Sequence, residues 1–485
     1  MPMSDALVHG DPQRMVPKSN WKDMREYLSF LETKKDIVFI EDEVDPTWEI
    51  NALTRVTLQR LGPCVVYKNI KGADYPCVTG TIATDRRFLW ALGIEKWSEF
   101  NEEWRKRTKE LVSPRVVKDA ICQEETIKER DIDINKICNI RWHALDRKPF
   151  SGTLSISVTK DPDTGVYNAG IYRHENHGHN ILTWGAPEYT HGRQHLLKWE
   201  RRGQPMPIAI VTGVDPITLM VGATRTPPNV DEFQLAGALR GEPLEMVKCQ
   251  TIDLLVPATA EWVFEGYIYP GARRMEETVW FGEYTGHYGE QRLLPEIQIS
   301  HITHRRNPIY QGTREQWYPS ESFYLNGRTS QAEVYKTLKQ IVPGVIDLRC
   351  NVAYEAIVQI DKLFKGHPQQ VIDAVWGSTY SRYKHVIVVD QDVDIWDYEQ
   401  VHWALSTRVK ADRDVTITSN RAGQWLDPAT PLHEKGWQSG MGIDATIPTE
   451  YYELWGDDVP QTVADPEAVA RVHKESAKVL AKILG

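Results

Sequence analysis

Polar residues that could do chemistry gather in four short segments of this 485-residue chain. The first, residues 168–179, begins with Asn168 and holds Arg173 and three histidines: His174, His177 and His179. Three histidines in six residues fit a metal site and equally a solvated histidine-rich loop, because histidine serves both roles. If residues 167–173 form a strand, Asn168 and Tyr172 share one face and Arg173 points to the other.

Two further segments each open a predicted helix. His191 and His195 are spaced i, i+4 in a helix expected to reach Trp199, a spacing found in metal-binding helices, but no HExxH sequence accompanies them. Glu232 stands just ahead of a helix expected to reach Leu239. An acidic residue there either serves a site or only stabilises the helix dipole.

The fourth segment, residues 275–288, combines acidic and aromatic residues. Its carboxylates are Glu276, Glu277 and Glu283, and its nearest aromatic side chains are Trp280, Phe281 and Tyr284. Carboxyl groups walled by aromatic rings have raised pKa values and can serve as general acids. The alternative is an exposed acidic loop, which would not need so many aromatic neighbours.

The chain has no GxGxxG after a strand, no P-loop, no GxSxG and no zinc ribbon. Residue chemistry alone therefore predicts only that Asn, His, Glu and Arg side chains assemble around an anionic ligand and a hard cation.

The elements that must position these residues fall into three parts. In the first, we predict a helix from Trp21 to Leu31 capped by Ser19 and Asn20. Elements of a small α/β domain follow: strands at 37–40 and 64–67 and a helix at 86–92.

From residue 151 to about 311, short strands separated by glycine and proline favour a barrel or closed sheet. The clearest of these strands are 153–159, 167–172, 207–211 and 261–268.

The third part alternates helices and strands. Helices at 331–341 and 396–407 and strands at 385–389 and 415–417 are typical of an α/β unit. An amphipathic helix follows Asp465 and Pro466, and we expect it to dock on its own domain or on a neighbouring subunit.

Composition argues against several classes of protein. The net charge of −10 and the lack of a basic stripe argue against a nucleic-acid partner. No apolar window is long enough for a membrane helix, and the N-terminus lacks a signal-peptide core, so we expect a cytoplasmic protein. The six cysteines form no CxxC pair and are expected to be buried, reduced thiols. The 17 tryptophans and 20 tyrosines suit an enzyme that holds flat ligands.

Eight segments, taken in order, resemble those of one known family: Glu43–Pro46, Asn168–Arg173, Glu245–Cys249, Asp253–Ala258, Glu265–Ile268, Gly282–Gly286, Trp403–Arg408 and Met441–Thr446. Each is weak alone, but the ordered series is specific. On these segments the chain resembles the UbiD decarboxylase family, from Glu43 almost to Pro448.

The resemblance implies a multi-domain α+β fold of three domains and a terminal helix. These are an N-terminal α/β domain over residues 1–115 with a connector to about 150, a central flavin-binding domain like a split β-barrel over 116–325, a C-terminal α/β oligomerisation domain over 326–460, and the amphipathic helix over 461–485. A homo-oligomer, dimer or hexamer, is also implied.

The resemblance further implies a prenylated FMN cofactor, supplied by a flavin prenyltransferase, together with Mn²⁺ (or Mg²⁺) and K⁺. Asn168, His191 and Glu232 match the residues that hold the divalent metal against the cofactor phosphate, a donor set that suits manganese or magnesium. Ile171 is expected to contact the cofactor. Arg173 matches the arginine beside the reactive flavin edge.

The carboxylates of this family show one departure here. Glu283 matches the second carboxylate, and we expect it to donate a proton. The position of the first carboxylate is Thr278, so Glu277 or Glu276 must take that role, and we favour Glu277 as the hydrogen-bond partner of Arg173. His174 stands where an uncharged residue is expected and is predicted to face the substrate.

The expected reaction is the reversible, non-oxidative decarboxylation of a small aromatic or heteroaromatic acid. We predict that residues 316–325 and Tyr288 wall the pocket, and that His174 and His287 hydrogen-bond a ring hydroxyl or N–H group. The alternatives are an acrylic (cinnamate-type) or polyprenyl-hydroxybenzoate acid as substrate, a plain FMN oxidoreductase, and a catalytically silent assembly subunit.

Overall fold

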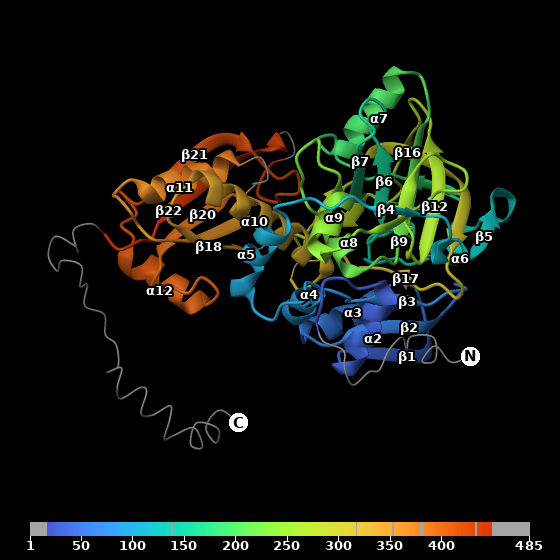
Figure 1. Cartoon of the computed structure of the whole chain (residues 1–485), viewed down its shortest axis with the longest axis horizontal. Coiled ribbons are helices and arrows are strands. Elements are labelled where there is room, and N and C mark those ends of the chain that lie inside the picture. Colours follow the sequence, from blue (N-terminus) through green and yellow to red (C-terminus); the bar gives the residue numbers. More distant parts are fainter. Residues whose placement is uncertain are drawn as a thin grey trace, which may run out of the picture.

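The computed structural model describes residues 17–137, 139–316, 318–351, 354–378, 383–431 and 434–448. Three parts follow one another along the chain, built on a four-stranded, an eight-stranded and a five-stranded sheet (Figure 1). The predicted mixed α/β organisation is confirmed in outline. The helix predicted over 461–485 lies outside the described residues.

The N-terminal part is a four-stranded sheet covered by helices. Its strands, in spatial order, are β1 (Ile37–Val44), β2 (Cys64–Ile70), β3 (Cys77–Thr79) and β17 (Tyr310–Gln311). Its helices are α2 (Met24–Thr33), α3 (Glu49–Gln59), α4 (Asp85–Ala91) and α5 (Trp97–Arg107). Strand β17 arrives from the end of the central part, so it ties the first two parts together.

The first helix begins later than predicted. Asp23 caps α2 by accepting a hydrogen bond from the Glu26 backbone N–H at 2.8 Å, so the expected cap at Ser19 and Asn20 is wrong. A carboxylate at the N-cap satisfies one of the four free N–H groups of a helix end.

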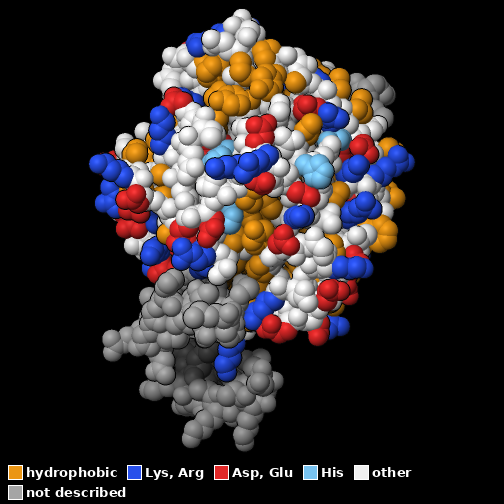
Figure 2. All heavy atoms as spheres, turned by 90° about the vertical axis from the view of Figure 1, so that its right-hand side faces the viewer, with side chains coloured by type: hydrophobic (Ala, Val, Ile, Leu, Met, Phe, Trp, Pro, Cys, Tyr) orange, Lys and Arg blue, Asp and Glu red, His pale blue; other side chains and the backbone are white. Residues whose placement is uncertain are grey.

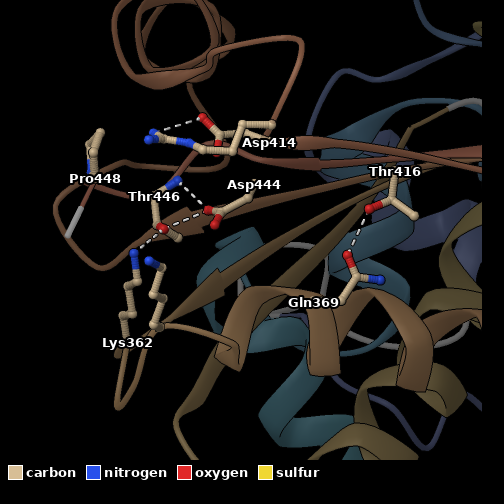
Figure 3. Close-up of a pocket in the computed structure, with 9 residues that line it drawn as sticks. Lys362, Gln369, Asp414, Thr416, Asp444, Thr446 and Pro448 are labelled. Atoms are coloured by element: carbon tan, nitrogen blue, oxygen red, sulfur yellow. Dashed lines mark hydrogen bonds and ion pairs between the residues drawn. The ribbon is translucent and has the colours of Figure 1, made fainter. Parts of the chain in front are cut away.

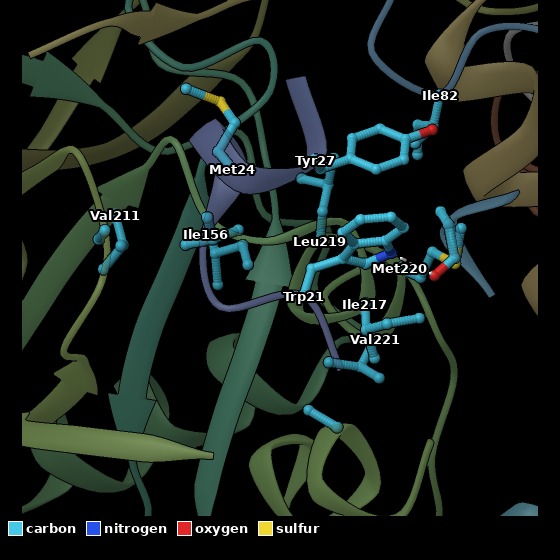
Figure 4. Close-up of a cluster of buried hydrophobic side chains, with 14 of the residues drawn as sticks. Trp21, Met24, Tyr27, Ile82, Ile156, Val211, Ile217, Leu219, Met220 and Val221 are labelled. Atoms are coloured by element: carbon cyan, nitrogen blue, oxygen red, sulfur yellow. Dashed lines mark hydrogen bonds between the residues drawn. The ribbon is translucent and has the colours of Figure 1, made fainter. Parts of the chain in front are cut away.

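Trp21 lies just before this helix and is fully buried. It packs with side chains of α2, among them Met24 and Tyr27, and the same apolar cluster extends to α8 (Pro216–Val221) and the central sheet (Figure 4). The N-terminal and central parts therefore share one continuous core, and burial of such large side chains is the main favourable term in folding.

The central sheet is open. Its main path runs through β13 (Arg273–Met275), β16 (Leu293–His304), β12 (Trp262–Ile268), β9 (Met206–Thr212), β6 (Ile156–Lys160) and β7 (Tyr167–Ile171). The remaining two strands, β5 (Glu125–Lys128) and β8 (Ile181–Thr183), pair with β16. Within the described ranges no pairing joins β7 to β13, so the prediction of a barrel or closed sheet is wrong.

The outer edge of β7 is covered by other groups instead of a strand. The backbone N–H of Ile171 donates to the carbonyl of Gly222, and that of Ala169 donates to the carboxylate of Glu232. An edge strand satisfied in this way does not need a neighbour.

Shorter elements complete the central part. They are β4 (Arg115–Val117), β10 (Glu245–Lys248) and β11 (Leu255–Pro257) in one small sheet, the hairpin of β14 (Trp280–Gly282) and β15 (Tyr288–Glu290), the helices α6 (Ile134–Ile137), α7 (His191–Arg201) and α9 (Glu232–Arg240), and the 3₁₀ turns η2 (Ile121–Gln123) and η3 (Glu129–Asp131).

The C-terminal part is the predicted α/β unit. Its sheet has the order β18 (Val345–Asn351), β19 (Glu355–Ile360), β20 (His385–Asp390), β22 (Trp437–Asp444) and β21 (Val415–Ala422). Its helices are α10 (Glu321–Ile341), α11 (His367–Gly377) and α12 (Tyr398–Arg408). Helix α10 begins ten residues before the predicted start at Gln331, capped by Ser320, and with α5 it lies where this part meets the rest (Figure 1).

The surface seen in Figure 2 mixes Lys and Arg side chains with Asp and Glu side chains, and hydrophobic side chains gather towards its upper edge. Among the residues that the structure describes, no helix combines the length and apolarity required to cross a bilayer. Five of the six cysteines are buried and form no disulfide with one another, as predicted, and Cys138 lies outside the described residues.

Candidate active site

A cavity of about 560 Å³ lies where the central and C-terminal parts meet. Strand β7, the first residues of α7 and α9, the β14–β15 hairpin, the first turns of α10 and residues 424–426 all contribute to its wall. A hollow of this volume is the usual size of a site for a cofactor or a drug-sized ligand. Asn168, Ile171, Arg173, His191, Glu232 and Glu283, predicted from sequence, all line it.

Arg173 is bound by two carboxylates. Its Nε and Nη2 donate to the two oxygens of Glu276 at 2.8 and 2.7 Å, and its Nη1 donates to Oε1 of Glu283 at 2.9 Å. The guanidinium also lies over the ring of Phe281, 4.6 Å from its centroid. Paired, charge-assisted hydrogen bonds of this kind fix both the position and the plane of a guanidinium.

The expected contact between Glu277 and Arg173 is wrong, because Glu276 makes it. The Glu277 side chain is 52% exposed and lies 3.3 Å from the ammonium group of Lys148. Adjacent residues of an extended segment point in opposite directions, so only one of the two glutamates can face the cavity.

Glu175 determines which of the two glutamates, Glu276 or Glu277, faces the cavity. This fully buried carboxylate accepts hydrogen bonds from the backbone N–H groups of Glu277 and Thr278, both at 2.8 Å. The N–H of Glu276 is bonded to the carbonyl of Arg292, which lies just before β16. The backbone of the loop is thus held on both sides of Glu276.

The pKa values of Glu283 and Arg173 are both raised in this site. Burial raises the pKa of Glu283 above its usual value, although the charge of Arg173 opposes this shift. Burial alone would lower the pKa of Arg173, but Glu276 and Glu283 outweigh it and raise that pKa. The set therefore combines a permanently charged arginine with a carboxyl group whose pKa lies above its usual value.

Asn168, His191 and Glu232 come together at another part of the same cavity wall. Asn168 Nδ2 donates to Glu232 Oε1 at 3.2 Å, and His191 Nδ1 lies 4.0 Å from the same oxygen. Thr226 also donates to this oxygen, at 2.8 Å. Burial raises the pKa of Glu232 to about 7 and lowers that of His191, which favours a neutral imidazole.

These three residues fit a divalent cation. The carbonyl oxygen of Asn168 is buried and has no hydrogen-bond partner among the described residues, and Glu232 is a buried carboxylate beside only hydroxyl, amide and imidazole groups. An orphaned carbonyl, a carboxylate and a neutral imidazole are the ligands that Mn²⁺ and Mg²⁺ accept. Gly192 leaves room for them, since a Cβ there would stand 2.9 Å from the Asn168 oxygen.

The other histidines do not join this group. His174 is fully buried between Thr183 and Ser157 and does not line the cavity, so the prediction that it faces the substrate is wrong. His179 is exposed, and His195 is bonded to the hydroxyl of Thr159. The histidine-rich segment is thus not a metal site formed by its own members.

The predicted substrate walls are only partly correct. Of residues 316–325, Ser322 and Leu325 line the cavity, whereas Phe323 and Tyr324 pack in the core, and Trp317 lies outside the described residues. His287 and Tyr288 lie on the hairpin but not on the cavity wall.

The lining residues that were not predicted include Arg292 just before β16, Glu315 before α10, and Trp425 from the C-terminal part. None of these three belongs to the four segments that the sequence singles out. The tertiary structure alone brings them to the cavity.

A smaller hollow of about 210 Å³ lies on the C-terminal part (Figure 3). Its charged groups are satisfied locally: Lys362 Nζ donates to Thr446 at 2.8 Å, and Arg413 donates to Asp414 at 2.9 Å. None of the residues predicted to act in catalysis lines it.

Three family descriptions match successive parts of the chain. They are the N-terminal domain of 3-octaprenyl-4-hydroxybenzoate carboxy-lyase over residues 28–107, its Rift-related domain over 115–316 and its C-terminal domain over 323–445. Together they cover all three sheets.

Solved structures agree over nearly the whole chain. The UbiD-class enzyme HmfF from Pelotomaculum thermopropionicum, in complex with FMN, is 33% identical over 92% of this chain and 97% of its own, with a TM-score of 0.82. Vanillic acid decarboxylase from Sedimentibacter hydroxybenzoicus is 30% identical over 95% and 99%, with a TM-score of 0.83.

A third similar structure is the 3,4-dihydroxybenzoic acid decarboxylase of Klebsiella pneumoniae, which is 27% identical over 93% of this chain and 99% of its own, with a TM-score of 0.80. With three matching domains in order, and with relatives of this identity and coverage, the chain belongs to the UbiD family and is a carboxy-lyase.

Proposed function

We propose that this protein decarboxylates a small aromatic or heteroaromatic acid, reversibly and without net oxidation, using prenylated FMN. The observation that carries the proposal is Arg173 held between Glu276 and Glu283 on the wall of one large cavity. Relatives that are decarboxylases of vanillic and 3,4-dihydroxybenzoic acid support the substrate class.

The cofactor is assigned from relatives and from the cavity. HmfF has been solved with FMN and, in an evolved dimeric form, with prFMN. When bound, prenylated FMN supplies an electron sink for a carbanion that an aromatic ring cannot delocalise. Asn168, His191 and Glu232 would hold Mn²⁺ or Mg²⁺ against its phosphate, and Ile171 and Arg173 would contact the flavin. The potassium ion stays a prediction without assigned ligands.

The chain's own residues would bind and orient the substrate and deliver a proton to it. Arg173 retains donors beyond those it gives to the two glutamates, and these would hold the substrate carboxylate. Glu276 fixes the guanidinium. As CO₂ leaves, the electron pair of the broken C–C bond remains on the ring carbon, and Glu283 would transfer its proton to that carbon.

The test is decarboxylation by the purified protein, produced with and without a co-expressed flavin prenyltransferase. We expect loss of the absorbance of aromatic acids, with release of CO₂, only from the protein that carries prenylated FMN. Equal activity with unmodified FMN would refute the cofactor assignment. Protein loaded with prenylated FMN that acts on acrylic acids and on no aromatic acid would refute the substrate class.

The metal site is tested by Glu232→Gln. The amide keeps the size of the side chain and can still hydrogen-bond Thr226, but it removes the charged ligand, so we expect metal and flavin content to fall together while the thermal unfolding temperature of the unloaded protein is kept. Metal analysis and flavin absorbance of the purified protein measure the two. Wild-type metal content in the variant would exclude Glu232 as a ligand.

A further inference from the structure

Glu315 is a carboxyl group on the cavity wall to which the proposed reaction gives no role. It stands between β17 and α10, and its side chain is hydrogen-bonded to the hydroxyl of Ser322, which also lines the cavity. Ser322, Leu325 and Asn326 are spaced as one face of α10 and all border the cavity. The segment before α10 and the first turn of this helix therefore present one acid and one hydroxyl to the cavity.

This acid has no cationic partner. In the described part of the chain no salt bridge involves Glu315, whereas Glu276 and Glu283 share Arg173. Its electrostatic neighbours are two further acids, Glu283 and Glu321, and, without an ion pair, Arg173, whose charge opposes theirs. Burial, reinforced by these like charges, raises the pKa of Glu315 to about 8, so the group is mainly neutral at pH 7.

The segment that carries Glu315 is held firmly. Its backbone carbonyl is hydrogen-bonded to His143 Nε2 at 2.7 Å. On its two sides, Thr313 donates to Glu321 and Ser320 donates to the carbonyl of Gln316, each at 2.7 Å. A side chain on so well-fixed a backbone can discriminate between ligands, because it does not move to suit each one.

A neutral carboxyl group engaged with one hydroxyl still offers its second oxygen as an acceptor. We propose that Glu315, supported by Ser322, determines substrate specificity by accepting a hydrogen bond from a hydroxyl or N–H group on the ring of the acid. The inference rests on the proposed function and deepens it. The sequence predicted that His174 and His287 would bond such a ring group, but neither lines the cavity. We assign this role to Glu315.

The test compares matched acids that differ only in this donor. One pair is 4-hydroxybenzoate and benzoate, and the other is pyrrole-2-carboxylate and furan-2-carboxylate, which have nearly the same size. For the holoenzyme we expect kcat/KM to favour the donor-bearing member of at least one pair by about 10-fold or more, since a site built to bond a polar group rejects the analogue without it.

Substitutions at Glu315 and Ser322 test whether these residues cause the preference for the donor-bearing acid. Glu315→Leu should lower that ratio about 10- to 100-fold by weakening only the donor-bearing acid, the effect of losing a hydrogen bond to a buried group. Glu315→Gln, which keeps an acceptor, should retain most of the preference for the donor-bearing acid. Ser322→Ala should lower the ratio of kcat/KM values less than Glu315→Leu does. Glu277→Leu is the matched control, because Glu277 is half exposed and points away from the cavity.

The outcomes separate this inference from the proposed function. Failure of the prenylated-FMN enzyme on every acid would refute the function itself. Activity without preference in either pair, or an equal loss on both members in Glu315→Leu, would overturn the specificity role and leave the function standing. If Glu315→Leu does not fold, the same ratio in Ser322→Ala decides, and an unchanged ratio there would overturn the proposal.

Discussion

At the scale of single residues, the two carboxylates on Arg173 are not equivalent. Both oxygens of Glu276 bond the guanidinium, and Oε2 also accepts from the backbone N–H of Arg292. Glu283 uses only Oε1, and its second oxygen has no hydrogen-bond partner among the residues described. Glu276 is thus committed to holding the arginine, whereas Glu283 has an oxygen available to carry a proton to the substrate.

This difference predicts the effects of two neighbouring substitutions. Glu276→Gln loses one of two charge-assisted bonds to Arg173, and we expect kcat to fall about 10- to 100-fold. Glu277→Gln should leave kcat within about 2-fold of the wild type, because that side chain is half exposed and belongs to a surface ion pair. Steady-state kinetics of the two holoenzymes measure this, with the flavin content of each as a control. The reverse order of effects would contradict the geometry.

The pH dependence of turnover tests Glu283. Burial raises its pKa, and the protonated form is the one that donates. Turnover should therefore be highest at pH values below this raised pKa and fall as the pH rises through it.

Glu283→Gln, which keeps the shape but has no proton to give, should lower kcat by about 100-fold or more and abolish this descending limb. The measurement is kcat from pH 5 to 9, with the folded fraction checked at each pH. A limb that survives in Glu283→Gln would assign the proton to another group.

The sequence could identify the pair Glu276 and Glu277 but not choose between them. Both lie in one extended segment, and a one-residue difference in register exchanges which side chain faces inward. The choice is made by Glu175, a residue about 100 positions away whose buried carboxylate holds two backbone N–H groups of the loop. Asn168, Arg173 and Glu283 were predictable because each stands in a segment that resembles the family. His191 and Glu232 were matched to the family by position, each at the start of a predicted helix.

At the scale of elements, close packing around β7 keeps Arg173 in place. Gly185 is hydrogen-bonded to the carbonyl of Arg173, and a Cβ at this position would stand 2.6 Å from Cγ of the arginine. The arginine side chain passes over this glycine on its way to the two glutamates. Any larger residue at 185 would have to displace it.

Gly185→Ala should therefore reduce kcat by about 100-fold, the effect of misplacing a catalytic group by about 1 Å, while leaving the proposed metal ligands Asn168, His191 and Glu232 in place. Gly377→Ala is the matched control, since nothing lies within 4 Å of a Cβ at the end of α11. Kinetics and metal content of both variants are the readouts. Wild-type turnover in Gly185→Ala would show that the arginine is not confined there.

The elements themselves were predicted unevenly. Strands β1, β2 and β20 were found because their apolar runs are short and bounded by turns. The start of α10 was missed because its first ten residues include buried polar side chains such as Glu321 and Arg328, which hides the helical period of apolar residues. Closure of the central sheet was wrongly expected, because strand spacing does not reveal that Glu232 and Gly222 satisfy the edge of β7.

At the scale of the whole molecule, the cavity belongs to no single domain. The central part supplies Arg173, Asn168, His191 and Glu232, and the C-terminal part supplies Ser322 of α10 and residues 424–426. Trp425 completes this last wall, and Arg292 of the central part lies over its ring, 5.6 Å from the centroid. We therefore expect ligand affinity to depend on this contact across the boundary between the two parts.

The last prediction tests that dependence with two tryptophans of the C-terminal part. Trp425→Ala removes an aromatic wall of the cavity and the cation–π partner of Arg292, and we expect KM for the aromatic acid to rise about 10-fold, with a smaller change in kcat. Trp437→Ala is the control, because Trp437 is also exposed, at 60%, but does not line the cavity.

Steady-state kinetics of both holoenzymes at equal flavin content measure the effect, since a loss of cofactor would lower kcat and not raise KM. A rise in KM confined to Trp425→Ala would show that the C-terminal part forms a wall of the substrate site. Equal values of KM in the two variants would mean that the central part and α10 alone bind the acid.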